Sequence, residues 1–425
     1  LSPGRSDYQQ SHPYLFQPRS TGSTHRRHRH HRIHRSHREV KFLNMKNSTL
    51  TFFLSLILGT SLAHGAVHNV VSGQDLQSVI DSASSGDQIR LLSATYGDIE
   101  ISTKDLSFKS TGATPAFLGN VKITGSDVEF TRVGASTLEA DDLPNHPGEL
   151  ILTQGTFNSL DINCSKSTLL YCEIEHLVIA KKGLVVGCHM NGKMDGGIGI
   201  DIYGPDTVVT VRNSRIHSYS KTQSQETIET LIGIRVHIGA NAFIENNLIY
   251  DCYENHNGGL ETDCAIGIFV KPGSKTSILG NNIWNCYLLT HSYASTVATR
   301  GNCLVDAPSG TILRHNNLWK NRNEVTKIKG TVTGNENLDT DPKFTDKDNG
   351  DFTLQSDSPC IDAGPPDPQY NDRNGSRNDI GMFGGHDYIP NGRNSTKPVV
   401  ISLELPIAVP RNGTATIKST GATVK

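Results

Sequence analysis

Three short segments decide the fold of this chain: Gly199-Ile-Asp-Ile, Gly233-Ile-Arg-Val and Gly267-Ile-Phe-Val. They recur every 34 residues, and Gly301-Asn-Cys-Leu-Val follows after the same interval. A second apolar segment starts 13 to 15 residues after each glycine and begins with an asparagine: Asn213-Ser-Arg-Ile, Asn246-Asn-Leu-Ile, Asn281-Asn-Ile-Trp and Asn316-Asn-Leu-Trp. Paired alternating strands with an Asn turn between them predict the rungs of a right-handed parallel β-helix, an all-β solenoid.

The asparagines have two predicted roles. Asn tolerates the left-handed backbone of a tight corner, and stacked Asn amides can form hydrogen bonds from rung to rung. Helical repeat arrays have a similar period, but their units would read as helices. Shorter rungs are predicted upstream at 121–124, 149–152, 169–174 and 184–189. A helix that begins after Asp75, with apolar spacing at Leu76, Val79 and Ile80, is expected to cap the first rung.

The composition agrees with this fold. The 425 residues include 40 Gly and 18 Pro, and only 35% of them are hydrophobic. Such a composition suits many short strands joined by turns. The content of two Trp and four Met speaks against a large helical core.

The N-terminal 66 residues differ from the rest. Residues 1–44 form a basic tract around His25–Arg32, interpreted as misassigned upstream sequence or, alternatively, as a basic arm that binds metal or nucleic acid. Residues 45–66 have the pattern of a signal peptide: a start at Met45, a basic Lys46, an apolar run and a small-residue cleavage zone. The apolar run is too short to span a membrane. The mature protein is therefore expected to be secreted, at the cell surface or periplasmic, without a membrane span.

Removal of this region changes the net charge. Residues 1–66 contain ten of the 40 Lys and Arg but two of the 42 Asp and Glu, so the mature chain carries a net charge of −10. An acidic protein is a poor nucleic-acid ligand. All eight cysteines lie in the exported part, where disulfides are permitted. Cys252 and Cys286 are one repeat apart, and either a disulfide or a ladder of free thiols is compatible with that spacing.

The C-terminal motifs add a family resemblance. Asp341-Pro-Lys-Phe, Gly350-Asp-Phe-Thr-Leu, Ser358-Pro-Cys-Ile-Asp-Ala-Gly and Asp379-Ile-Gly-Met-Phe follow the rungs. Together with the cap helix and the rungs, they make residues 67–385 resemble bacterial exported β-helix proteins of the pectate-lyase-like superfamily. The β-helix is predicted to cover 67–390. Residues 391–425, with strand patterns at 399–405 and 414–421, are expected to be a linker and the start of a β-sandwich-like module that the chain does not complete.

The resemblance implies a polysaccharide groove along one strand column, assigned here to the three repeated segments. Alternation places Asp201, Arg235 and Phe269 outward in one column and Tyr203, His237 and Lys271 in the next. Arg235, His237 and Lys271 are the candidate catalytic residues, and Asp201, Tyr203 and Phe269 are the candidate substrate-binding residues. Asp306 is expected near the following rung. The same mixture of charges is also typical of ordinary surface ion pairs, which contribute about 0–1 kcal/mol each.

Calcium is a further expectation. Long loops at 218–231, 254–263 and 288–300 are predicted to overhang this face, and Glu254, Glu261 and Asp263 could supply oxygen ligands. In a lyase, Ca²⁺ would bind the uronate carboxylate while Arg235 or Lys271 removed the neighbouring proton.

Several family motifs are missing from this sequence. The paired-Asp, Gly-His-Gly and Arg-Ile-Lys motifs of polygalacturonases are absent, since Asp141-Asp142 is predicted to lie in a loop before the regular rungs, and Asn371–Asp379 reads as a closing turn. A fold of this kind does not fix an activity. The sequence therefore supports a protein that binds an acidic polysaccharide, with cleavage by β-elimination as an extension. A non-catalytic adhesion or stalk module is the alternative.

Overall fold

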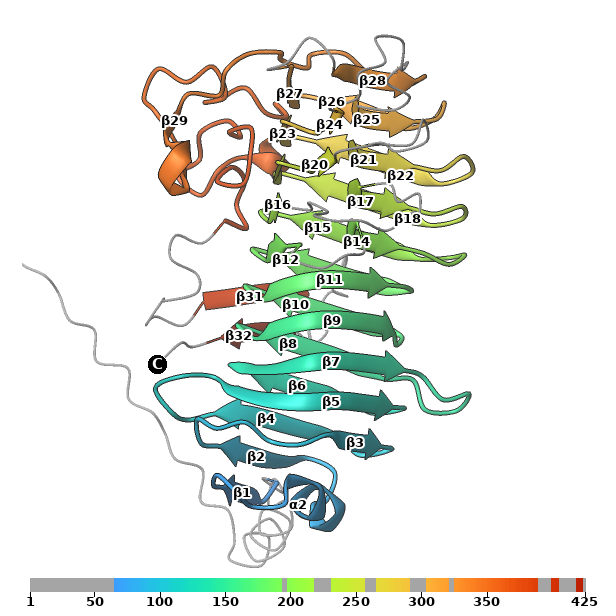
Figure 1. Ribbon diagram of the computed structural model, residues 1–425, viewed down its shortest axis with the longest axis vertical. Coiled ribbons are helices and arrows are strands. Elements are labelled where there is room, and N and C mark those ends of the chain that lie inside the picture. Colours follow the sequence, from blue (N-terminus) through green and yellow to red (C-terminus); the bar gives the residue numbers. More distant parts are fainter. Residues whose placement is uncertain are drawn as a thin grey trace, which may run out of the picture. The chain divides into compact units, whose positions relative to one another are not determined.

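The computed structural model describes residues 65–192, 197–217, 231–256, 265–290, 303–320, 325–388, 399–404 and 418–422; in 253–256, 287–290, 399–404 and 418–422 only the backbone is described. The described chain forms a right-handed parallel β-helix, as predicted. Figure 1 shows its rungs stacked in chain order from β1 to β28. The predicted basic tract and signal peptide lie outside the described residues, apart from Gly65 and Ala66.

One side of the coil is a parallel sheet to which each rung contributes one strand. Within the described chain it has eleven strands: β1 (Val67–Val70), β2 (Asp87–Leu91), β4 (Leu106–Ser110), β6 (Val128–Thr131), β8 (Glu149–Thr153), β10 (Lys166–Leu170), β12 (Lys182–Val186), β15 (Val208–Arg212), β18 (Asn241–Glu245), β22 (Lys275–Leu279) and β26 (Ile312–Arg314). We call it the first sheet.

The second sheet divides as the rungs lengthen. Its undivided strands are β3 (Ile99–Ser102), β5 (Ala116–Thr124), β7 (Val133–Asp141), β9 (Thr156–Asn163) and β11 (Glu173–Ile179). Beyond β11 one arm contains β13 (His189–Asn191), β16 (Arg215–His217), β19 (Leu248–Tyr250), β23 (Asn282–Trp284) and β27 (Asn317–Trp319). The other arm contains β14 (Ile198–Ile202), β17 (Leu231–Val236), β21 (Ala265–Val270), β25 (Cys303–Ala307) and β28 (Thr326–Gly330).

The 34-residue repeat sets the register of this second arm. Ile200 pairs with Ile234 and Ile234 with Ile268 in parallel strands, and all three side chains are buried in the core. Because consecutive side chains of a strand point to opposite faces, Asp201, Arg235 and Phe269 face outward. The predicted stacking of the three segments is confirmed.

The predicted cap helix is α2 (Leu76–Ser82). The Asp75 side chain accepts hydrogen bonds from the backbone N–H groups of Gln77 and Ser78, as expected of an N-cap. Leu76 and Ile80 are buried against the first rung's end of the core. The helix thus covers apolar side chains that would otherwise face solvent.

The two predicted roles of asparagine belong to adjacent positions. Asn213 and Asn246 have positive φ angles of 50°, and they occupy the tight corner. The amide ladder lies one residue later: Asn247 Nδ2 donates to Asn281 Oδ1 at 2.9 Å, and Asn281 Nδ2 donates to Asn316 Oδ1 at 3.0 Å. Both roles are therefore confirmed. The corner in the rungs of Asn281 and Asn316 is occupied by Gly280 and His315, which also have positive φ.

Glycine and cysteine share a tight space behind the repeated segments. A Cβ atom on Gly233 would lie 2.6 Å from Gly267 O and 3.3 Å from Cys252 Sγ, and Gly267 lies in the same way against Cys286 Sγ. Both cysteines are fully buried and carry free thiols, so the ladder alternative is confirmed. The space taken by each thiol explains why glycine opens these segments.

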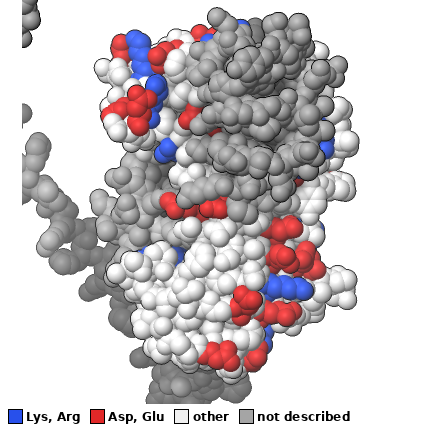
Figure 2. Space-filling view, viewed as in Figure 1, with Lys and Arg blue, Asp and Glu red and all other residues white. Residues whose placement is uncertain are grey.

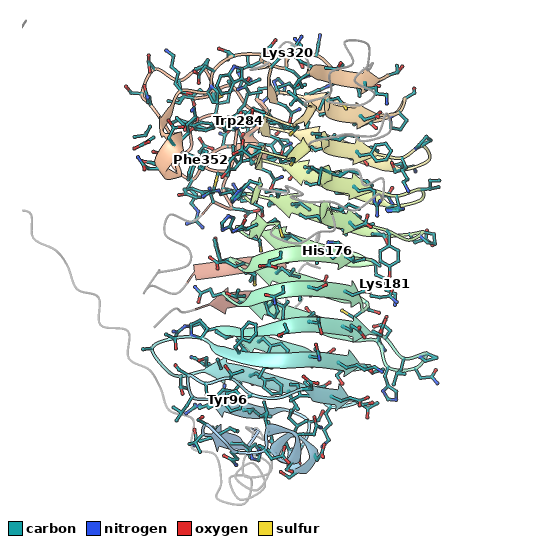
Figure 3. All side chains as sticks on the ribbon, in the orientation of Figure 1. Tyr96, His176, Lys181, Trp284, Lys320 and Phe352 are labelled. Atoms are coloured by element: carbon teal, nitrogen blue, oxygen red, sulfur yellow. The ribbon has the colours of Figure 1, made fainter. Side chains whose placement is uncertain are left out.

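A C-terminal segment, residues 339–388, packs against the outside of the last rungs. It contains the antiparallel pair β29 (Phe344–Asp346) and β30 (Asp351–Leu354) and the short turns η1 (Lys347–Asn349) and η2 (Pro368–Tyr370). Phe344 and Phe352 bury Tyr250 and Trp284 beneath them, and Figure 3 shows Trp284 and Phe352 at this junction. The predicted turn at 371–379 is confirmed: Asp372 Oδ1 accepts from the Gly385 N–H at 2.5 Å.

Two further strand pairs are described. β20 (Tyr253–His256) pairs with β24 (Tyr287–Thr290) in parallel, so parts of two predicted loops are strands. β31 (Val399–Glu404) pairs with β32 (Lys418–Ala422) in antiparallel register, close to the predicted patterns. No helix in the described part of the chain is long and apolar enough to cross a membrane.

An aromatic stack that ends in two histidines runs under the C-terminal segment. His189, His217, Tyr250 and Trp284 lie on successive strands with ring centroids 4.8 to 5.4 Å apart. His189 Nε2 and His217 Nε2 are 2.5 Å apart. Burial lowers the pKa of His217 to about 3, with further lowering from Arg215 and His189. The imidazole of His217 is therefore neutral in the folded protein at any pH above that value.

We expect acid to weaken the fold through His217. The unfolded chain binds a proton near the ordinary pKa of 6.5, while the folded chain does so only near 3. Stability is therefore complete above pH 6.5 and falls as the pH is lowered between these values, by an amount on the order of 3 kcal/mol. Urea titrations across this range measure it. His217→Phe keeps an aromatic ring on Tyr250 and should flatten the pH profile. The control His386→Asn, at an exposed position, should leave it unchanged, and an unaltered profile in His217→Phe would refute the assignment.

Candidate functional site

The candidate site is built on the outward side of β14, β17 and β21. Asp201 aligns with Arg235, Arg235 with Phe269, and Phe269 with Asp306 on the next strand. Backbone hydrogen bonds from His237 N to Ile202 O and from Lys271 N to Val236 O continue the stacking past the strand ends. The two predicted columns therefore lie next to each other, as alternation requires.

Arg235 is held by Asp201 of the rung below. Its Nε donates to Asp201 Oδ1 at 2.9 Å and its Nη2 to Oδ2 at 2.5 Å. Asp201 is only 9% exposed, so this is a bidentate pair with a largely buried carboxylate. The surface-pair alternative is thus correct for Arg235, and its charge is balanced within the protein.

His237 connects this pair to Lys271. Its Nε2 lies 2.9 Å from Asp201 Oδ1, and Lys271 Nζ lies 3.2 Å from His237 Nδ1. Since an ammonium group only donates, Nδ1 is the acceptor and the ring proton is on Nε2. That N–H is not aligned with the carboxylate and has no hydrogen-bond partner among the described residues. Burial lowers the pKa of His237, and Asp201 opposes this shift. A neutral ring agrees with its acceptor role toward Lys271.

The charges of these four groups do not cancel. Asp201 and Arg235 neutralise each other and His237 is neutral, so the Lys271 ammonium is left as the uncompensated charge of the four. Of the three predicted catalytic residues, the structure brings all into one contact chain. Lys271 is the one that offers an anion a charge not already paired.

Aromatic rings lie at both ends of the chain of contacts. Tyr203 precedes His237 in its column; its pKa is raised by burial and then by Asp161, Asp141 and Asp201. Phe269 is partly buried and packs on the cluster of Ile232, Ile266 and Cys303. Both positions agree with their prediction as faces for sugar rings.

Carboxylates gather on the same sheet toward the N-terminus. Glu139 aligns with Asp161, and Asp141 aligns with Asn163 on the neighbouring strand. Figure 2 shows acidic groups concentrated along the right-hand edge of this face. Burial, followed by Asp141 and Glu139, raises the pKa of Asp161. These residues were missed in the sequence because the rungs before residue 190 were not aligned with the repeat.

The prediction that Asp141-Asp142 lies in a loop is wrong for Asp141, which is the last residue of β7. Its strand is longer than predicted because Thr137, Glu139 and Asp141 align with the next rung. Asp142 follows the strand and accepts hydrogen bonds from the backbone N–H groups of Gly148 and Ser165, and it binds Lys181 Nζ at 2.6 Å. It therefore fixes the connection between rungs.

The predicted calcium ligands receive no geometric support. Glu261 and Asp263 lie outside the described residues, and Glu254 lies on strand β20, where only the backbone is described. Among the described residues, no group of three His, Cys, Asp or Glu side chains could hold a metal ion. No chemical step below is assigned to a cation.

The comparisons with known proteins concern the fold. No family model matches the sequence, and no curated protein matches it either. The crystal structure of pectate lyase Pel9A aligns with a TM-score of 0.46 and 13% identity, over 75% of this chain and 96% of that one. The PL6 family alginate lyase AlyGC aligns with a TM-score of 0.30 and 12% identity, over 69% of this chain and 56% of the other. The β-helix itself is established here by the strand register.

Proposed function

We propose that this protein is exported and binds an acidic polysaccharide along the outward side of β14, β17 and β21. The observation that carries the proposal is the contact chain Asp201–Arg235–His237–Lys271, which leaves one cation uncompensated between two aromatic residues. A uronate carboxylate would pair with Lys271, and Tyr203 and Phe269 would contact sugar rings. The signal-peptide pattern of residues 45–66 supports export.

We extend the proposal to β-elimination. A base removes the proton beside the uronate carboxyl group, its electrons form the new C=C bond, and the glycosidic C–O bond breaks. Arg235 is fixed as a cation by its bidentate pair, so Lys271 is the better of the two predicted bases. Its ammonium can pass a proton to His237, 3.2 Å away, before it accepts the substrate proton.

The test uses the purified full chain on a panel of polyuronates, each with and without calcium. Lys271→Ala should weaken binding by about 1–3 kcal/mol, as the loss of a charged hydrogen bond does. The difference should shrink as salt screens the attraction. Lys275→Ala is the matched control, since Lys275 is exposed on the first sheet of the same rung. His237→Ala should lower turnover more than affinity.

Arg235→Ala is a poorer probe because it leaves the buried carboxylate of Asp201 without its main partner. We expect it to destabilise the fold, so a loss of binding in this variant would be ambiguous. If wild type and Lys271→Ala bind every polyuronate equally, the proposed face is wrong. If the wild type binds but no unsaturated sugar end forms in either calcium arm, the protein is a binding module, which is the alternative from the sequence.

A further inference from the structure

A second cavity lies between the coil and the C-terminal segment. Its volume is about 360 Å³, and its walls include Arg212 and Glu245 from β15 and β18, and Gln369, Tyr370, His386 and Asp387 from the C-terminal segment. Pockets for small ligands start at roughly 300 Å³. The strands of this cavity belong to the first sheet, whereas Asp201 and Arg235 lie on the second sheet.

The walls of this cavity are fixed by buried hydrogen bonds. Asn213 Nδ2 donates to Met382 O at 3.0 Å and to Gly384 O at 2.7 Å. Asn246 and Asn378 exchange amide hydrogen bonds of 2.9 and 3.1 Å. Both asparagines of this pair are buried. The cavity is therefore bounded by an ordered interface and is not a gap between loosely packed parts.

The charges of the cavity select its ligand. Arg212 Nη2 lies 3.1 Å from Glu245 Oε2, and Nη1 contacts Asp387 Oδ2. Burial raises the pKa of Glu245, and Arg212 opposes that shift. One guanidinium thus faces two carboxylates, and the cavity offers an anion no uncompensated cation. An acidic sugar would meet net repulsion here.

The same groups suit hydroxyls. Among the described residues, Arg212 Nε is buried without a hydrogen-bond partner. Each carboxylate has about four lone-pair sites, of which Arg212 occupies few. The Tyr370 hydroxyl and the exposed Gln369 amide stand at the rim of the same space. Adjacent hydroxyls of a sugar ring both donate and accept, and therefore satisfy such a mixed set.

We propose that this cavity binds one neutral saccharide residue. It would give the protein a second carbohydrate site whose chemistry is opposite to that of the Lys271 face. The two sites lie on different sheets and share no residue, so each can be tested without the other.

The experiment titrates the full chain with neutral methyl glycosides of glucose, galactose, mannose, xylose and arabinose, followed by NMR. Galacturonic acid and methylammonium are the charged probes. We expect at least one neutral glycoside to bind at a single site and the charged probes to bind more weakly. Tyr370→Phe, which keeps the ring, should weaken that binding about threefold to tenfold, as the loss of a hydrogen bond does. Gln369→Ala tests a second wall without touching the buried pair.

Tyr388→Phe is the matched control, because Tyr388 packs edge-on against Phe383 and does not line the cavity. Binding should also be unchanged in Lys271→Ala, which separates this site from the acidic-glycan face. The proposal is overturned if no neutral glycoside binds, if the uronate or the amine binds more tightly, or if Tyr370→Phe and Gln369→Ala both bind as the wild type does.

Discussion

Replacing Asn281 by Leu is expected to destabilise the protein by about 4 kcal/mol, although the two side chains are similar in size. Asn281 Oδ1 accepts hydrogen bonds from the Asn247 N–H and Nδ2, both at 2.9 Å. Its Nδ2 donates to Ile244 O at 2.8 Å. All of these groups are buried, so the substitution leaves donors and an acceptor unsatisfied away from water. Each such group costs about 1–3 kcal/mol.

Urea denaturation at neutral pH measures this loss. Asn241→Leu in the adjacent rung is the control, because Asn241 lies on the outward face and should change the free energy of unfolding by less than about 0.5 kcal/mol. Asn281 also shares a bond with Asn316. The double variant Asn281→Leu/Asn316→Leu should therefore lose less than the two single variants together. A loss below 1 kcal/mol for Asn281→Leu would show that the ladder does not stabilise the coil.

Ile234→Asp should prevent folding. Ile234 is fully buried and lies between Ile200 and Ile268 in register, so a carboxylate there would have apolar neighbours on the rungs on both sides. The cost of an unpaired buried charge exceeds about 5 kcal/mol, which is comparable to the whole stability of many proteins. Circular dichroism and the soluble yield report the outcome.

Ile238→Asp is the matched control, since Ile238 is 66% exposed in the turn that follows β17. It should fold with little change in stability. Ile234→Val should also fold, with a loss of about 1 kcal/mol. Normal folding of Ile234→Asp would contradict the inward orientation, and with it the outward placement of Arg235.

The repeat predicted the register of the coil because residues on one face of stacked rungs meet the same surroundings. It could not place the asparagine ladder to the residue, since Asn213 and Asn246 share an αL corner with Gly280 and His315 while Asn247 forms the ladder. The spacing there is 33 residues and then 34. An insertion of one residue in a turn is invisible to a fixed period.

The site was predictable in position but not in pairing. Alternation places Arg235, His237 and Lys271 on one face. Whether Arg235 binds Asp201 or a ligand depends on side-chain rotamers, which a sequence pattern does not contain. The cavity at Arg212 was out of reach for another reason. It depends on a contact with Asp387, 175 residues later in the chain, and no local signal reports such a pairing.

The asparagines that hold the C-terminal segment also affect how the molecule unfolds. In a solenoid each rung contacts only its neighbours, so rungs can separate one at a time. The C-terminal segment, however, is bonded to Asn213, to Asn246 and, through the Gly381 N–H, to Gly280 O at 2.7 Å. These residues belong to three successive rungs. Opening of any one of the three strains a strap shared with the others, so this block unfolds cooperatively and becomes the most slowly exchanging part of the coil.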